Sequence, residues 1–222
     1  MNSTIFITGT GTGVGKTVLT ALLTEFIHGR GRRVAALKPI CSGGRADARR
    51  LQAALSGALS LDQINPWHFR AAIAPLLAAR QERRRVTLTQ VLAHLRAVGK
   101  QFEVVLIEGA GGLLSPLGAG FNSRDLISAL AARTIVVAPN QLGVVNHILL
   151  TLESLPEALR GQARVVLMAP PKPDSATASN PRLLRQLSVP AVCHLPWFGS
   201  GFSSSEVLQT PQVRKTLTTL VA

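Results

Sequence analysis

The sequence has 222 residues, of which 46% are hydrophobic and 16% charged. A chain of this kind can bury a full core without metal or disulfide cross-links, and it is not a disordered chain. Its net charge is +13, from 24 Lys and Arg against 11 Asp and Glu, which favours anionic partners. The basic residues are scattered, however, and there is no Tyr, so the chain has few aromatic side chains on which nucleic-acid bases could stack.

Four classes of protein are excluded by simpler features. Cys41 and Cys193 are far apart and form no C-x-x-C pair, which excludes a disulfide scaffold and a zinc ribbon. No apolar run reaches the ~18 residues of a membrane helix. The N-terminus lacks the charged region and cleavage site of a signal peptide. We therefore expect a cytoplasmic protein that binds neither nucleic acid nor membrane, and we interpret the dense basic run at residues 80–85 as a solvated helix end.

Short apolar runs alternate with stretches of helical period along the chain. The predicted strands cover residues 5–9, 33–39, 104–107, 134–138, 164–168 and 190–195. The predicted helices cover residues 16–29, 47–56, 88–98, 125–132, 144–155, 180–187 and 206–220. Pro75 is placed to open one more helix, and Thr87 with Gln90 forms a capping-box pair. This alternation predicts an α/β fold in which residues 1–222 form one domain around a single doubly wound, mostly parallel sheet.

The strongest functional motif joins the first strand to the first helix. It reads Gly9-Thr10-Gly11-Thr12-Gly13-Val14-Gly15-Lys16-Thr17. Glycines let the backbone curl so that successive N–H groups and a helix N-terminus meet a phosphate. Lys16 is then expected to reach the β- and γ-phosphates, and Thr17 to ligate Mg²⁺. The motif predicts a P-loop NTPase that binds ATP or another NTP, with its first glycine at Gly9 where the strict pattern has it at residue 10.

Two further side chains end strands of the predicted sheet. Glu108 follows the most apolar strand, and Lys38 stands at the end of the second strand. The carboxyl ends of parallel strands share one edge with the phosphate loop. Glu108 is therefore a candidate magnesium ligand. Lys38 is either a second cation at that edge or an ordinary surface lysine.

Taken in order, these motifs resemble the ATP-dependent dethiobiotin synthetases, and the displaced Gly9 is itself typical of that family. The resemblance is carried by the phosphate loop, Lys38-Pro39, Ser42-Gly43, Glu108-Gly109-Ala110-Gly111-Gly112, Leu142-Gly143, Asn146-His147, Thr151 and Leu195-Pro196-Trp197. It implies a homodimeric P-loop ligase, with its active site at the subunit interface. Such an enzyme forms the ureido ring of dethiobiotin from 7,8-diaminopelargonate, CO₂ and ATP.

The resemblance also implies roles for single residues. The catalytic residues would be Lys16, Lys38 and Ser42. The nucleotide would contact Thr12, Gly13, Val14, Gly15, Lys16, Thr17, Pro196 and Trp197, and Mg²⁺ would contact Thr17, Asp47 and Glu108. The substrate would contact Lys38, Ser42 and Gly111, together with Gly143, Val144, Val145 and Asn146 of the second subunit. Asp47 and Asn146 could instead cap the helices in which they lie, and for Asp47 the two roles are compatible.

One departure from the family concerns the nucleotide base. Members that read adenine carry Asn-Asp after the strand over 164–168, whereas Ala169 and Pro170 follow it here. Neither side chain can read a purine edge, so the base preference stays open.

Two other functions also stay open. One is a P-loop ligase or phosphotransferase acting on a different carboxylate or carbamate. The other is a basic ATPase that uses ATP as a switch on DNA or on a protein. Gly11 argues against the second, because partition-type ATPases carry their signature lysine at that place.

Overall fold

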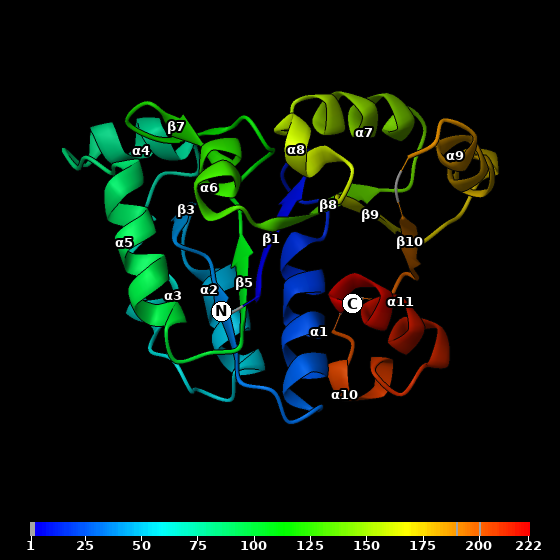
Figure 1. Cartoon of the computed structure of the whole chain (residues 1–222), viewed down its shortest axis with the longest axis horizontal. Helices are drawn as coiled ribbons and strands as arrows, with labels where there is room; N and C mark the ends of the chain where they lie inside the picture. Colours follow the sequence, from blue (N-terminus) through cyan, green and yellow to red (C-terminus); the bar gives the residue numbers. More distant parts are fainter. Residues whose placement is uncertain (1–2, 190, 200) are drawn as a thin grey trace.

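The computed structural model describes residues 3–189, 191–199 and 201–222. Six strands form one sheet in the order β10-β9-β8-β1-β5-β2, and every pairing in it is parallel. These strands are β1 (Ser3–Gly9), β2 (Val34–Leu37), β5 (Val104–Glu108), β8 (Arg133–Pro139), β9 (Arg164–Met168) and β10 (Val192–Leu195) (Figure 1). The predicted α/β fold with a doubly wound parallel sheet is confirmed. Residue 190 of the predicted last strand lies outside the described residues.

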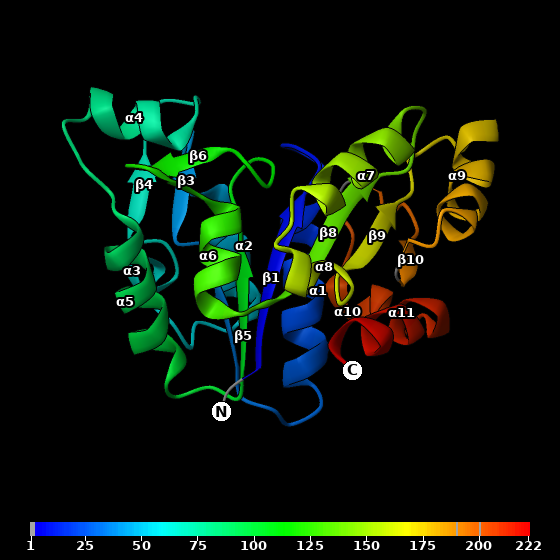
Figure 2. The same ribbon diagram turned by 45° about the horizontal axis from the view of Figure 1, so that its top comes forward.

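Helices cover both faces of this sheet, as Figure 2 shows from a second direction. One face is covered by a layer in which the first helix packs between the other two: α1 (Lys16–His28), α2 (Ala46–Ala54) and α11 (Pro211–Val221). The other face is covered by α5 (Leu88–Gly99), α6 (Ser123–Leu130), α7 (Val144–Glu153) and α9 (Ser175–Gln186). From β1 the chain moves to β2 at one edge, and later through β8 to β10 at the other. The strand order therefore reverses beside β1, which is where such sheets bind ligands.

The remaining elements are shorter. They are β3 (Ile40–Ser42), β4 (Trp67–Phe69), β6 (Pro116–Gly118), β7 (Phe121–Asn122), α3 (Leu61–Ile64), α4 (Pro75–Gln81), α8 (Glu157–Arg160) and α10 (Ser204–Val207). Of these, the sequence predicts α4, which Pro75 opens as expected, and the end of α10 within the helix expected over 206–220. The predicted capping box of Thr87 and Gln90 at α5 is also confirmed. Segments of two to four residues show no period in the sequence, so the other short elements carry no signal.

Two predicted helices differ from the structure. The helix expected over 206–220 is divided into α10 and α11, because Pro211 lacks an N–H and opens a new helix instead of continuing one. The helix expected over 180–187 begins at Ser175, although Pro181 lies inside it. The proline leaves the carbonyl of Thr177 without its helical donor, and the side-chain amide of Asn140 donates to that carbonyl at 2.9 Å.

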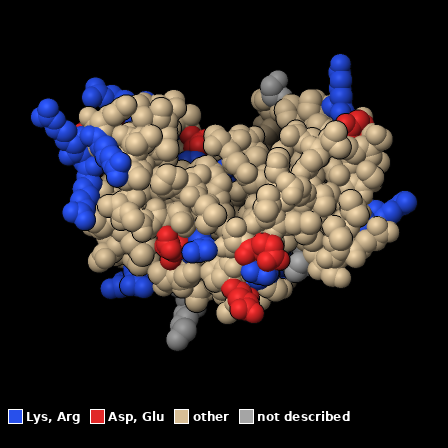
Figure 3. Space-filling model, turned by 90° about the horizontal axis from the view of Figure 1, so that it is seen from above, with Lys and Arg blue, Asp and Glu red and all other residues tan. Residues whose placement is uncertain are grey.

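Basic side chains project singly around the visible face in Figure 3, with the largest group at the end where α4 and α5 lie. The run at residues 80–85 belongs to this end: α4 ends inside it and its arginines are exposed, so the interpretation as a solvated helix end is confirmed. Among the described residues, no helix is long and apolar enough to cross a membrane.

Candidate active site

The phosphate loop folds as its glycines predict. It leaves β1 at Gly9 and enters α1 at Lys16, with φ of 74° at Gly13 and 98° at Gly15. These values lie in the left-handed region, where a side chain would be strained. The Lys16 side chain is buried and its Nζ donates to the carbonyl of Gly11 at 2.6 Å, across the loop. Burial lowers the pKa of Lys16 to about 8, even though Glu108 and Asp47 oppose this shift.

The displaced first glycine has a steric cause. A Cβ on Gly9 would lie 2.7 Å from Cγ2 of Val14 and 2.9 Å from the backbone oxygen of Val137 in the neighbouring strand β8. Residue 9 must therefore lack a side chain. At residue 10 the backbone N–H of Thr10 donates to the same Val137 oxygen at 3.0 Å, which fixes the turn out of β1.

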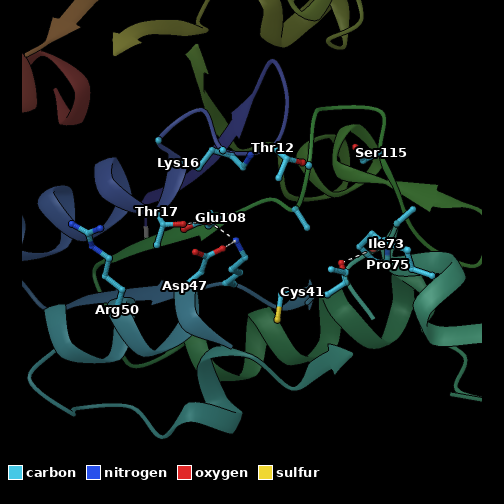
Figure 4. A pocket seen from close by; sticks show the side chains of 18 of the residues that line it. Thr12, Lys16, Thr17, Cys41, Asp47, Arg50, Ile73, Pro75, Glu108 and Ser115 are labelled. Carbon is cyan, nitrogen blue, oxygen red and sulfur yellow. Dashed lines mark hydrogen bonds and ion pairs between the residues drawn. The ribbon is translucent and has the colours of Figure 1, made fainter. Parts of the chain in front are cut away.

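Lys38 and Glu108 are brought together by the register of the sheet. Leu37 pairs with Ile107 where β2 and β5 run side by side, so the next residue of each strand also lies beside the other. The Lys38 Nζ donates to Glu108 Oε1 at 2.6 Å and to Asp47 Oδ2 at 2.5 Å (Figure 4). The Thr17 hydroxyl donates to the same Glu108 Oε1 at 2.7 Å. Lys38 is only 5% exposed, so the alternative of a surface lysine is wrong.

Charge holds this cluster together in spite of its burial. Burial on its own would lower the pKa of Lys38, but Glu108 and Asp47 outweigh it and raise that pKa above its usual value. For Asp47, burial acts to raise the pKa, and Lys38 more than reverses this, so the carboxyl pKa falls below its usual range. Asp47 does not cap its helix, because Arg45 stands at the N-cap. The capping alternative for Asp47 is therefore wrong, and its side chain serves the cluster.

Asn65 is a positioning residue that sequence reasoning missed. Its fully buried amide donates to the backbone oxygen of Lys38 at 2.7 Å and accepts from the Cys41 thiol at 3.1 Å. The backbone N–H of Lys38 also donates to the carbonyl of Ile64 at 3.0 Å. These bonds hold the chain after β2 in one position. The sequence offers no signal for them, because the partners are about 25 residues apart and meet only through the fold.

Two cavities meet at the phosphate loop. The first, of about 740 Å³, contains the charged cluster and also Thr12, Ser42 and Gly111. The second, of about 790 Å³, is bordered by Val14, Pro196 and Trp197. Both are large enough for a small ligand. Gly13, Gly15, Val18 and Arg50 border both cavities, so one continuous site runs past the loop.

Comparison with known proteins agrees with this geometry. A family model described as an AAA domain matches residues 3–200. The chain is 38% identical over 199 residues to the ATP-dependent dethiobiotin synthetase of Anaeromyxobacter sp. (strain K), covering 87% of this chain and 89% of that one. It is 34% identical over 211 residues to the ATP-dependent dethiobiotin synthetase of Xylella fastidiosa (strain M12), covering 90% and 93%. The chain belongs to the ATP-dependent dethiobiotin synthetase family.

Solved structures support the fold of this dethiobiotin synthetase family member. A ParA family ATPase from Chlorobium tepidum TLS superposes with a TM-score of 0.62 at 10% identity, covering 99% of this chain and 98% of that one. The MinC:MinD cell division complex of Aquifex aeolicus gives a TM-score of 0.60 at 14% identity, covering 99% and 96%. At these identities the likeness concerns the fold alone.

The residues expected at the substrate are divided between two places. Ser42 and Gly111 border the first cavity, and the Ser42 hydroxyl donates to the carbonyl of Ile73 at 2.6 Å. Of the described residues, those at 143–146 border neither the first nor the second cavity. Gly143, not Asn146, is the N-cap of α7, so the capping alternative for Asn146 is wrong.

The second cavity is lined by apolar side chains where hydrogen bonds would be needed to recognise a nucleotide base. Ala169, Pro170 and Pro171 border it next to Met168, and Phe198 and Phe202 stand on another side. Asn140 and Gln141 border it too, and the Asn140 amide already bonds to the carbonyl of Thr177 and the side chain of Asn180. The side chains here can stack on a base but offer few groups that could distinguish one base from another.

Proposed function

We propose that this protein is a dethiobiotin synthase that forms the ureido ring from 7,8-diaminopelargonate, CO₂ and ATP, releasing ADP and phosphate. One observation carries the proposal: the phosphate loop, a second buried lysine at Lys38 and the hydroxyl of Ser42 border one cavity. A second ammonium beside the loop suits an enzyme that must bring a carbamate to a phosphate, because the two anions repel each other.

The proposed reaction has three steps. An amine of the substrate attacks CO₂ and loses a proton, which gives a carbamate. A carbamate oxygen then attacks the γ-phosphorus of ATP, and ADP leaves. The second amine attacks the carbonyl carbon of this carbamic–phosphoric anhydride, closes the ring, expels phosphate and loses its proton to solvent. Lys16 and Lys38 supply the positive charge on either side of the reacting groups, and Ser42 would hydrogen-bond the carbamate.

We further propose Mg²⁺ as a cofactor, held by Thr17, Asp47 and Glu108. Two carboxylates and a hydroxyl form an all-oxygen set, which is the kind that Mg²⁺ prefers. Glu108 Oε2 supports this choice, because it is buried without a hydrogen-bond partner in the described structure while Oε1 accepts two bonds. When bound, Mg²⁺ would neutralise phosphate charge during the transfer.

The proposed homodimer would give a role to the 143–146 segment, which borders neither the first nor the second cavity. Leu142 is 84% exposed, Leu150 59% and Leu114 52%. Apolar side chains exposed to this degree close to one another are typical of an interface, and Leu114 and Leu150 border one shallow hollow. A second subunit packed there would receive the α7 N-terminus, whose partial positive charge suits a substrate carboxylate. We also propose that residues 1–222 form one domain and act in the cytoplasm.

The test is one assay with ATP, Mg²⁺, bicarbonate and 7,8-diaminopelargonate, in which phosphate and dethiobiotin are followed together. Equal amounts of both products, formed only when the diamine is present, are expected. Lys16→Ala and Lys38→Ala should abolish both, whereas Lys100→Ala, a lysine exposed at the end of α5, should not. Phosphate release that does not depend on the diamine would contradict the substrate and leave the nucleotide site in place.

A further inference from the structure

Arg50 stands where the two cavities join. It lies on α2 one helical turn after Asp47, so both side chains project from the same face of that helix. It is the one charged residue among the described residues that border both cavities. Figure 4 shows it at the margin of the first cavity on the side of Thr17, opposite the end formed by Ser115 and Pro75.

The Arg50 guanidinium is held by an aromatic ring. Its central carbon lies 4.9 Å from the centre of the Phe202 ring, and Phe202 packs on Phe198 with their ring centres 5.0 Å apart. Both phenylalanines border the second cavity. A cation over a ring keeps its N–H donors free, because the attraction acts through the face of the π-system. The contact therefore fixes the position of the guanidinium and leaves its donors for another group.

The charge of Arg50 has no acidic partner within the described part of the chain. The other two cations of the cavities are engaged: Lys16 donates to Gly11, and Lys38 pairs with both carboxylates. Arg45, the N-cap residue of α2, pairs with Asp62 at 2.8 Å. Glu25, which borders the second cavity, makes no ion pair with Arg50. Arg50 is thus an oriented cation at a ligand site without a protein anion to neutralise it.

The position along the site indicates which part of a nucleotide it meets. In a phosphate loop the lysine lies at the β- and γ-phosphates, and here Lys16 belongs to the first cavity only. The base and ribose would occupy the apolar second cavity. Gly13, Gly15, Val18 and Arg50 form the junction between the two cavities, and a nucleotide bound in this way would have its polyphosphate meet its ribose there. We propose that Arg50 binds the α-phosphate of the nucleotide and that Phe202 holds its guanidinium in place.

This inference rests on the proposed use of a nucleotide and deepens it. Because Arg50 contacts phosphate and not the base, its contribution should be the same for purine and pyrimidine nucleotides. A guanidinium suits this place better than an ammonium, since its planar donors can bind two phosphate oxygens while it stays stacked on a ring.

The experiment measures the binding of ADP, CDP and inorganic pyrophosphate by titration calorimetry, without turnover. Arg50→Ala should weaken ADP and CDP by the same factor of about ten, the size expected for one charge-assisted hydrogen bond, and leave pyrophosphate unchanged. Phe202→Leu should weaken both nucleotides by a smaller factor, and Arg50→Lys should restore part of the loss. Arg49→Ala is the matched control, because Arg49 is the adjacent exposed arginine and borders neither cavity.

Each contrary result would refute one part of the Arg50 proposal. Unchanged ADP binding in Arg50→Ala would remove the contact altogether. Equal weakening of pyrophosphate would place it at the β- or γ-phosphate, and a loss seen with ADP but not with CDP would place it on the base. A cooperative thermal melting transition of each variant would confirm that the variant is folded. A wild-type protein that binds these nucleotides but makes no dethiobiotin would refute the proposed reaction without affecting the Arg50 contact.

Discussion

Replacing Lys38 by methionine should destabilise the folded protein by several kcal/mol, because it leaves a buried carboxylate without its counter-ion. The Lys38 side chain is 6% exposed and that of Glu108 is 0% exposed, while Asp47 is 49% exposed. Lys38→Met keeps an unbranched apolar chain of similar length, so the change removes charge with little change in packing. It separates the electrostatic role of the ammonium from its volume.

The magnitude follows from these contacts. Removing one partner of a buried ion pair costs about 3–5 kcal/mol. The half-exposed bond to Asp47 adds about 0–1 kcal/mol. The Thr17 hydroxyl still donates to Glu108 Oε1, which offsets about 1 kcal/mol. We expect a loss of about 3 kcal/mol, which corresponds to a fall of roughly 6–12 °C in Tm for a chain of this size.

The assay is urea unfolding in EDTA, so that no divalent cation replaces the ammonium. The double variant Lys38→Met with Glu108→Gln should regain at least half of the lost stability, because the amide no longer leaves a charge buried. A loss below about 1 kcal/mol in Lys38→Met, or a double variant in which the two losses simply add, would refute the reasoning. Either result would mean that Glu108 is not held by the Lys38 ammonium.

Three further predictions concern the loop, the thiol and a histidine. Gly9→Ala should lower both the nucleotide affinity and the stability, the latter by about 1–3 kcal/mol. The reason is that the added Cβ would lie 2.9 Å from the backbone oxygen of Val137. Gly11→Ala is the control, because a Cβ at that position would have no atom within 4 Å. Burial raises the pKa of the Cys41 thiol, so iodoacetamide should alkylate it far more slowly in the native than in the urea-unfolded protein, and equal rates would contradict this. Burial, with Arg185 adding to it, lowers the pKa of His194 below its usual 6.5. The unfolded chain then takes up the proton more readily, so urea midpoints should fall as the pH drops through about 6.5, and His194→Gln should show a smaller fall.

Much of this site can be predicted from the sequence because its parts are local. The glycines around Lys16, and Glu108 as the carboxylate that ends an apolar run, are recognisable from neighbouring residues alone. Once a parallel sheet is inferred, the ends of its strands must share an edge, and Lys38 meets Glu108 there. The inference needs only strand positions, which apolar runs mark well.

The rest depends on contacts between distant segments. The continuity of α9 past Pro181 requires the amide of Asn140 at the carbonyl of Thr177, and nothing near Pro181 in sequence announces that donor. Asn65 holds Lys38 in the same way, from a segment that looks irregular. Arg50 and Arg49 are adjacent residues of the same type, and they are separated by what the fold places around them: Arg50 borders both cavities and lies over Phe202, whereas Arg49 borders neither cavity. Pro211 is visible in the sequence as a residue that can open a helix, but the helical period continues on both sides of it and hides the break between α10 and α11.

Helix α2 connects the two ends of the site. Asp47 on its first turn meets Lys38 at the carboxylate cluster, and Arg50 one turn later faces the junction with the second cavity. Arg45, just before the helix, donates to the backbone oxygens of Leu61 and Asn65, and so ties the start of α2 to the segment that positions Lys38. A shift of α2 would therefore move the Asp47 carboxylate and the Arg50 guanidinium together. Substitutions at Arg45 should affect metal-dependent and nucleotide-dependent properties jointly, whereas substitutions at Arg50 should affect nucleotide binding alone.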